Sequence, residues 1–180
     1  AYRGLSYTVA IQVVQMPYFL IIASVFCCIS WWLIGLANSP DSFFFMVLSV
    51  FTLITVGNAF STAVSVFVPN PMIGQTLGTT ILAIMFLFSG FFIKNPDIPD
   101  YWLWLHYLSV FKYGYDSMAV NILKNHFSIP GVMTNAEVLE YCGVDGQNRG
   151  LGVGVLWAWV IVFRVIFYFR LVTAFNGSRK

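Results

Sequence analysis

Few side chains in this sequence have the type and spacing that catalysis requires. His106 and His126 lie twenty residues apart, and neither has a cysteine or carboxylate nearby at the spacing of metal ligands. The chain contains no Gly-x-Ser-x-Gly turn for a nucleophilic serine and no Gly-rich Walker loop ending in Gly-Lys-Ser or Gly-Lys-Thr for nucleotide phosphates. We therefore expect no catalytic residue, no metal site and no cofactor within this chain.

Polar side chains inside long apolar stretches are the better candidates for function. Asn58 and Gln75 carry amides, which are costly in hydrocarbon unless they find a partner. Thr79, Ala83 and Phe86 follow Gln75 along one stripe of an expected helix. We interpret these five residues as candidates for lining a path through a membrane.

Helix packing is the more ordinary explanation of the same region. Gly57, Ser61 and Ser65 recur at four-residue spacing, and Gly74 and Gly78 do the same in the next stretch. Small residues at this spacing let helix backbones approach closely in lipid. Both interpretations stay open at the level of sequence.

Two further features fall inside apolar stretches. Phe91 and Phe92 follow Gly90, and two bulky rings at a helix end predict either a hydrophobic constriction or an aromatic anchor at the membrane interface. Arg164 stands in the middle of an apolar run, where an isolated guanidinium is expensive. We expect Arg164 to have a structural partner rather than a role in binding substrate.

The elements that position these residues are long and apolar. Hydrophobic residues make up 59% of the chain and charged residues 9%, against about 25% charged residues in soluble domains. Stretches of about 20 apolar residues suffice to cross a bilayer, and four are predicted, at 13–36, 43–68, 72–93 and 151–175. The predicted fold class is therefore all-α: a polytopic membrane protein with four transmembrane helices plus short re-entrant or extracellular helices.

The interval 94–150 differs from the rest, since it holds ten of the sixteen charged residues and begins with a strongly aromatic segment. We predict an extracellular loop with short helices that re-enter the outer leaflet, and cytoplasmic termini, because basic residues slightly favour the terminal side. Lys112 and Asp116 are spaced to pair on one helix face, although a solvated pair is an equal alternative. No basic cluster suits nucleic acid.

Short landmarks run in a fixed order along nearly the whole chain: Ala1-Tyr2-Arg3-Gly4-Leu5-Ser6-Tyr7, Gln15-Met16-Pro17-Tyr18, Trp32-Leu33-Ile34-Gly35-Leu36, Phe88-Ser89-Gly90-Phe91-Phe92-Ile93, Ile98-Pro99-Asp100-Tyr101-Trp102, Lys112-Tyr113-Gly114-Tyr115-Asp116 and Phe163-Arg164-Val165. In this order the sequence resembles the C-terminal half of the transmembrane domain of the ABC transporter G subfamily. The plant half-size members are the most similar in character.

The resemblance implies part of an ABC-2 type exporter membrane domain. Residues 1–12 would form a coupling region in which Tyr2, Arg3, Ser6 and Tyr7 face an ATPase domain, and ATP and Mg²⁺ would bind on that domain, outside this chain. A second half-transporter, identical or not, would complete a cleft for lipidic or amphipathic small molecules.

The same resemblance implies roles for single residues. Thr79, Ala83 and Phe86 match positions that line the cleft, and the pair Phe91–Phe92 matches a valve at its outer end. Cys142 is the only cysteine in the outer loop, so it is a candidate for an interchain disulfide and not for one within the loop.

Our hypothesis at this stage is the membrane-domain portion of an ATP-driven exporter, located in the plasma membrane. The alternative is a membrane-embedded scaffold or assembly subunit with no transport activity of its own.

Overall fold

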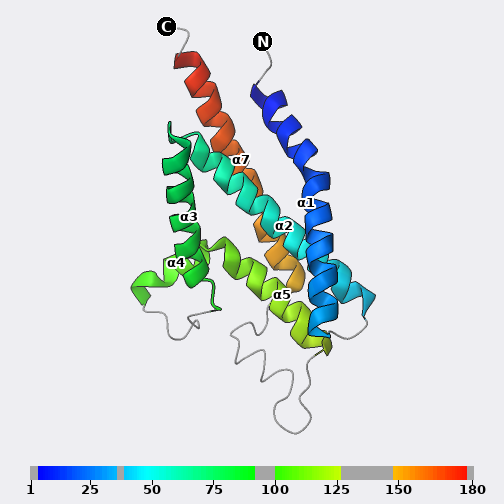
Figure 1. The fold of residues 1–180 in the computed structure, drawn as a ribbon. Coiled ribbons are helices and arrows are strands. Elements are labelled where there is room, and N and C mark those ends of the chain that lie inside the picture. The colour runs from blue at the N-terminus through cyan, green and yellow to red at the C-terminus, as the bar shows by residue number, and fades with distance from the viewer. Residues whose placement is uncertain (1–3, 36–38, 92–99, 127–147, 178–180) are drawn as a thin grey trace.

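All regular structure in the described part of the chain is helical. The computed structural model describes residues 4–35, 39–91, 100–126 and 148–177. Within these ranges the chain forms six α-helices and one short 3-10 helix (Figure 1), in the order α1 Gly4–Ile34, α2 Pro40–Ser65, α3 Pro71–Leu87, η2 Asp100–Trp102, α4 Leu103–Leu108, α5 Val110–His126 and α7 Arg149–Gly177. The all-α prediction is confirmed.

The helix starts follow from local chemistry. Proline occupies the first turn of both α2 and α3, where its missing N–H removes no hydrogen bond. Asn70 caps α3, because its side-chain oxygen accepts from the Met72 amide at 3.0 Å. Asp41 stands in the first turn of α2, where a negative charge complements the helix dipole.

Three helices are long and apolar enough to cross a membrane. These candidate spans are Thr8–Ile34, Pro40–Ser65 and Arg149–Thr173, which match the predicted spans at 13–36, 43–68 and 151–175. The remaining predicted span, 72–93, corresponds to α3, which is apolar but only 17 residues long. The chain leaves the helix after Leu87 and turns at Gly90, whose φ of 93° is open to glycine at little cost.

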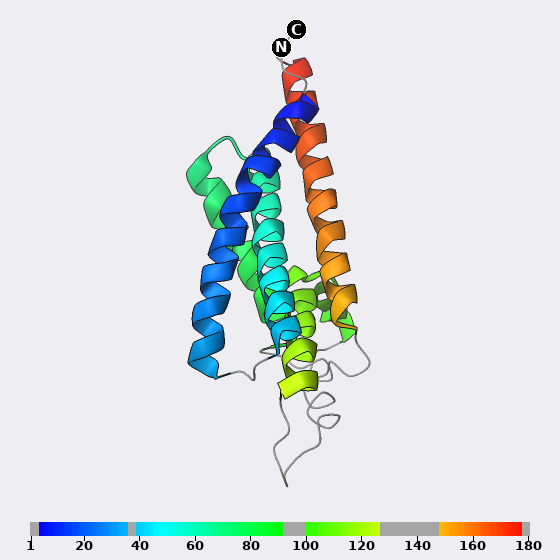
Figure 2. The ribbon, with the colours of Figure 1, turned by 90° about the vertical axis from the view of Figure 1, so that its right-hand side faces the viewer.

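The long helices form one bundle around α2. In Figure 1 and Figure 2, α1, α2 and α7 lie side by side, and the start of α1 and the end of α7 lie at the same end of the bundle. From that end α3 descends only partway. Helix α4 lies near the point where α3 ends, and α5 runs obliquely from there toward the end of the bundle where α2 begins.

The structure sharpens the prediction for the loop 94–150. Helix α5 packs against both α2 and α7, and no residue from Val110 to Leu123 is exposed. Two close approaches fix this packing: Gly114 of α5 lies against Leu53 of α2, and Gly152 of α7 lies against the backbone of α5 at Tyr113. The aromatic segment therefore leads into a buried helix rather than a solvated loop.

The hydrophobic core has two main parts. The larger cluster joins α2, α5 and α7 with the end of α3, and its buried members are Val56, Ala59, Phe60, Ala63, Met85, Val110, Leu156, Val160 and Phe163. The smaller cluster joins α1 to α2 through Ala23, Cys27, Trp31, Met46 and Val50. Cys27 and Cys28 are free thiols in an apolar helix, as small packing residues would be.

Candidate functional site

A groove of about 570 Å³ lies between the second half of α2 and the first half of α3. We call it the α2–α3 groove. Its lining mixes apolar side chains with hydroxyls, amides and glycines: Ser61, Val64, Ser65, Val68, Pro69, Asn70, Gly74, Gln75, Gly78, Thr79 and Leu82. Because α2 ends and α3 begins here, the groove lies toward the end of the bundle that holds the start of α1 and the end of α7.

Gln75 and Thr79 are the predicted path residues that line this groove. They also border a second hollow of about 430 Å³, which opens on the outer side of α3 and is completed by Met72, Thr76 and Thr80. The hydroxyl of Thr79 donates to the carbonyl of Gln75 at 2.8 Å. The threonine oxygen therefore keeps its acceptor capacity available to a molecule in the groove.

The other three predicted path residues lie elsewhere. Ala83 and Phe86 are exposed on α3 but do not line the groove, and the Phe86 ring packs edge-on against Phe111 of α5 at 5.4 Å. Asn58 is also outside it. Its side-chain oxygen accepts a hydrogen bond from Arg164 at 3.0 Å, which gives its amide a structural partner. The predicted set is thus brought together only in part.

The small residues of α2 and α3 serve the groove more than close packing. A Cβ added at Gly57 or Gly78 would meet nothing within 4 Å, and one at Gly74 would meet only Val68 in ordinary contact. Ser61, Ser65, Gly74 and Gly78 all line the groove. Within this chain the small-residue pattern therefore marks an open surface, whereas the tight glycine contacts occur at positions 114 and 152.

Arg164 has the structural partner that the sequence analysis expected. It joins α7 to α2 through Asn58. Its Nε and Nη1 atoms are buried, and they have no hydrogen-bond partner among the described residues. Nearer the end of α7, the guanidinium of Arg170 lies 4.6 Å from the centre of the Phe67 ring, so a cation–π contact ties the same two helices where α2 ends.

Phe91 follows the turn that ends α3. Its side chain is 60% exposed, and its ring meets Tyr115 of α5 edge-on at 5.8 Å. Phe92, its predicted partner in a valve, lies outside the described residues. The described geometry therefore places one aromatic ring of the predicted pair at the junction of α3 and α5.

His106 and Ser109 were not predicted as site residues, yet both reach the end of α3. The Nδ1 atom of His106 lies 2.8 Å from the carbonyl oxygen of Phe88, and the Ser109 hydroxyl donates to the carbonyl of Met85 at 2.6 Å. Burial lowers the pKa of His106 below its ordinary value, and nearby Lys112 adds to this effect. No spacing in the sequence connects these residues, because the contacts cross between separate helices.

Lys112 and Asp116 form the pair that their spacing allowed. The Lys112 ammonium lies 3.3 Å from an Asp116 carboxylate oxygen, and the two side chains are only 9% and 8% exposed. The ammonium also lies 5.2 Å and 5.0 Å from the ring centres of Tyr107 and Tyr113. The solvated alternative is therefore wrong, and the pair is a buried feature of α5.

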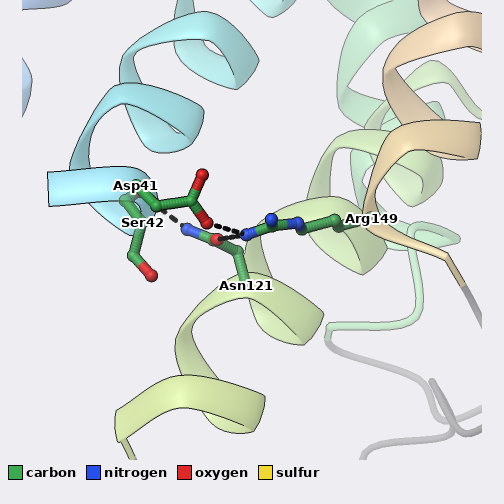
Figure 3. A network of polar contacts seen from close by, with 4 residues as sticks. All are labelled: Asp41, Ser42, Asn121 and Arg149. Carbon is green, nitrogen blue, oxygen red and sulfur yellow. Dashed lines mark hydrogen bonds and ion pairs between the residues drawn. The ribbon is translucent and has the colours of Figure 1, made fainter. Parts of the chain in front are cut away.

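A polar network joins α2, α5 and α7 at the opposite end of the bundle (Figure 3). Arg149, the first residue of α7, donates to Asp41 at 2.7 Å and to the side-chain oxygen of Asn121 at 3.2 Å. The amide nitrogen of Asn121 donates to the Ser42 carbonyl at 2.9 Å. Asn121 is buried, so its amide is satisfied on both atoms by partners far away in sequence.

The remaining predicted residues stay as sequence predictions. Ser6 is exposed on the first turn of α1, whereas Tyr2, Arg3 and Cys142 lie outside the described residues, and so does the side chain of Tyr7. In the ranges that the structure describes, histidines, cysteines and carboxylates do not gather into a group that could hold a metal.

Known proteins match this chain along its whole length. The family model described as ABC-2 type transporter matches residues 1–123. The chain is 29% identical to ABC transporter G family member 2 and 30% identical to family members 20 and 6, all from Arabidopsis thaliana, and in each case all of this chain is covered. It spans about 30% of the length of those relatives. The chain therefore belongs to the ABC-2 type transporter family, as membrane domain distantly related to plant ABC transporter G family members.

Proposed function

We propose that this chain supplies part of the substrate path of an ATP-driven, ABC-G-type exporter of lipidic or amphipathic small molecules. The observation that carries the proposal is the α2–α3 groove, in which Gln75 and Thr79 present polar atoms beside the apolar side chains of the lining, with further polar groups from Ser61, Ser65 and Asn70. A surface of this kind suits a ligand that is mostly apolar and has few polar groups.

The exposed polar face of α3 supports a path rather than lipid contact. Gln75, Thr76, Thr79 and Thr80 are all exposed on a helix that is otherwise apolar. The threonine hydroxyls donate to carbonyls one turn earlier, at 2.8–3.0 Å, which lowers their cost in hydrocarbon. The amide of Gln75 has two donors and an acceptor, and such a group is expected to face a cavity or a partner chain.

A second half-transporter would complete the cleft. The described residues cover only one face of α3, and large apolar side chains on its other faces are exposed, among them Met72 at 80% and Ile73 at 52%. A homo- or heterodimer would place a partner's helices or bound substrate over part of this surface. A disulfide between the two copies at Cys142 belongs to the same proposal.

Energy would come from an ATPase domain on another part of the transporter. Tyr2, Arg3, Ser6 and Tyr7 would meet that domain at the cytoplasmic end, where α1 begins and α7 ends, and ATP with Mg²⁺ would bind there rather than in this chain. Closure of the cleft would then drive the substrate past Phe91 and Phe92 and out of the plasma membrane.

The groove is tested by isosteric removal of its polar atoms. In the full-length transporter, Thr79→Val and Gln75→Leu are expected to change the apparent KM for efflux by about two- to tenfold each, as for one lost hydrogen bond. Thr173→Val is the matched control, because its hydroxyl makes the same type of bond, to Phe169 at 2.9 Å, on α7 and away from the groove.

Efflux from inside-out vesicles and substrate-stimulated ATPase activity are the measurements. If the two groove variants behave like Thr173→Val at equal protein levels, the groove is not the substrate path. The scaffold alternative would then gain support if the same protein still assembled with its partners but moved no substrate.

A further inference from the structure

The end of α3 is held by side chains from another part of the chain. In a regular helix the amide of Ser89 would donate to the carbonyl of Met85. Here that amide donates to Phe86 instead, at 3.2 Å, because the last turn tightens. The Met85 carbonyl is left without its backbone partner, and the Ser109 hydroxyl donates to it at 2.6 Å.

A second bond secures the residue that caps α3. The carbonyl of Phe88 lies beyond the helical ladder, and the Nδ1 atom of His106 approaches it at 2.8 Å. Ser89, His106 and Ser109 are 1%, 3% and 0% exposed. Because all three are buried, losing either donor would leave a carbonyl unpaired away from water, which is costly.

Aromatic contacts flank these two bonds on both sides. Phe88 stacks on Trp102 at 5.5 Å, before α4, and Phe86 meets Phe111 edge-on at 5.4 Å, in the first turn of α5. The segment from Trp102 to Phe111 therefore contacts the last turn of α3 through both polar and aromatic groups. We call this segment the α4–α5 hairpin. It runs from Trp102, the last residue of η2, to Phe111 at the start of α5.

These contacts with the end of α3 determine where Phe91 lies. Gly90 has a φ of 93°, and a Cβ built at Gly90 would stand 3.4 Å from Cε1 of His106. The turn at Gly90 therefore lies directly against the imidazole of His106. Phe91 emerges from it to contact Tyr115, one turn further along α5 than Phe111.

We infer that His106 and Ser109 are positioning residues for the outer gate: through their bonds to Phe88 and Met85, they hold the end of α3 where Phe91 meets Tyr115. The inference rests on the proposed function, because it assumes that Phe91 gates the path. It adds the means by which the gate is coupled to the rest of the bundle.

The hairpin is suited to that coupling because α5 is packed against α2 and α7. A shift of the α2–α7 pair would be carried by α5 to Ser109 and His106, and from there to the end of α3. Between the end of α3 and α5, the ring pairs Phe86–Phe111 and Phe91–Tyr115 meet edge-on, and such contacts slide easily. The two hydrogen bonds, in contrast, fix distance and direction. The bonds therefore transmit movement that the rings would not.

The test uses Ser89 as a reporter, since it is buried between the two bonds. Its hydroxyl accepts from the Phe91 amide at 3.5 Å, so efflux by the Ser89→Cys protein is first compared with the wild type and then serves as the reference. The full-length transporter would carry Ser89→Cys in a background in which Cys27, Cys28, Cys142 and every cysteine of the rest of the transporter are replaced by serine. The measurements are the labelling rate of the new thiol by a membrane-impermeant maleimide, and efflux, on the same preparations. Elution as a single folded species checks that each variant is intact.

Four variants are compared in this background. Ser109→Ala removes one donor, and His106→Phe removes the other while keeping a ring. His106→Gln restores a donor for the Phe88 carbonyl. Tyr113→Phe is the matched control, because it deletes a hydrogen bond of 3.0 Å from Tyr113, two residues beyond the hairpin, to the Tyr107 carbonyl within it, and this bond does not involve α3.

We expect Ser109→Ala and His106→Phe each to raise the labelling rate about two- to tenfold and to change efflux with it. Tyr113→Phe should change neither, and His106→Gln should bring both measurements back toward the reference. Unchanged labelling in both loss variants would overturn the inference, and so would an equal rise in Tyr113→Phe. Raised labelling with unchanged efflux would overturn it as well, since the bonds would then cap a helix and nothing more.

Failure of the proposed function is visible separately. Phe91→Ala leaves both hydrogen bonds in place and alters the gate alone. If Phe91→Ala changes efflux while Ser109→Ala and His106→Phe do not, the gate stands and the positioning role is wrong. If none of the three changes efflux, the gate itself is wrong, and the inference about what positions it is overturned with it.

Discussion

Replacing Gly152 by alanine is a direct test of the packing between α5 and α7. A Cβ at this position would collide with Oγ of Ser117 and would lie 2.6 Å from the carbonyl oxygen of Tyr113. A hydroxyl can rotate away, but the carbonyl belongs to the backbone of α5 and is fixed by the helix. The added methyl group therefore forces the two helices apart.

Gly154 supplies the control for the size of the effect. It lies on the same helix, is exposed, and a Cβ there would meet nothing within 4 Å. Both substitutions gain about 1 kcal/mol from the higher helix propensity of alanine. Only Gly152→Ala overpacks the interface, which costs about 1–3 kcal/mol, and contact with backbone favours the upper part of that range. We expect Gly152→Ala to be less stable than Gly154→Ala by about 2–3 kcal/mol.

The measurement is reversible unfolding of the purified protein in mixed micelles, with increasing denaturing detergent and circular dichroism as the readout. The difference between the two variants cancels the propensity term, so it reports the overpacking alone. A second substitution, Ser117→Ala, should recover only part of the loss, because it removes the hydroxyl and leaves the Tyr113 carbonyl in place. Equal stability of the two alanine variants would refute the close approach of α5 and α7.

Three further predictions concern charged and titratable groups. Asp116→Asn should lower the free energy of unfolding by about 3–5 kcal/mol, because it leaves Lys112 buried without a counter-charge; replacing both residues by apolar ones should recover most of the loss in the same titration. The pKa of His106 is lowered in the fold, so its contribution to stability is full above the ordinary value near 6.5 and declines as pH falls below it toward the folded pKa; Tm should drop with acidity in the wild type and less so in His106→Gln. Arg149→Met should cost about 1–3 kcal/mol, mostly because it leaves the side-chain oxygen of buried Asn121 without its donor; only the smaller part from the pair with Asp41, whose side chain is 72% exposed, should vanish in high salt, and thermal melts at low and high salt would check it.

The long helices were predictable because their signal is local. An uninterrupted apolar run implies a candidate span, and prolines with Asn70 mark where the next helix starts. The bounds differ mainly at α1, which begins at Gly4 and continues through Pro17 as one helix, where the prediction began a span at 13. Its first turns are polar enough to have suggested a separate segment, yet the helix does not break between them.

The end of α3 and the burial of α5 were not predictable, because their causes are not local. Apolar residues continue past Leu87 in the sequence, and only the hairpin that reaches Met85 and Phe88 shows why the helix ends there. Short helices were predicted in the interval 94–150, but the sequence could not show that the amide of Asn121 on α5 donates to the carbonyl of Ser42, which lies 79 residues earlier. Such partners are visible only after the chain has folded.

The α2–α3 groove is a further feature that the sequence alone could not predict. Glycines and serines at four-residue spacing indicate that a helix surface is small, and this is equally consistent with a close helix contact and with an empty space. At Gly78 the space is open, whereas at Gly152 it is filled by another backbone. The pattern alone does not contain that difference, because it depends on which helix lies opposite.

The small polar residues of α2 help to explain how the buried helix α5 fits inside this bundle. Ser42, Ser49, Thr52 and Thr55 are fully buried on α2, and both threonine hydroxyls donate to carbonyls of their own helix at 2.8 Å. Small side chains let α2 and α5 lie close together: Gly114 of α5 lies against Leu53, and the Asn121 amide reaches the Ser42 carbonyl at 2.9 Å. Because α5 is fixed in this way while α3 is exposed on most sides, the junction between them joins a rigid element to a less constrained one. The bonds of Ser109 and His106 join the end of α3 to this covered element, so movement of α5 carries the end of α3 with it, and it is at this junction that Phe91 lies.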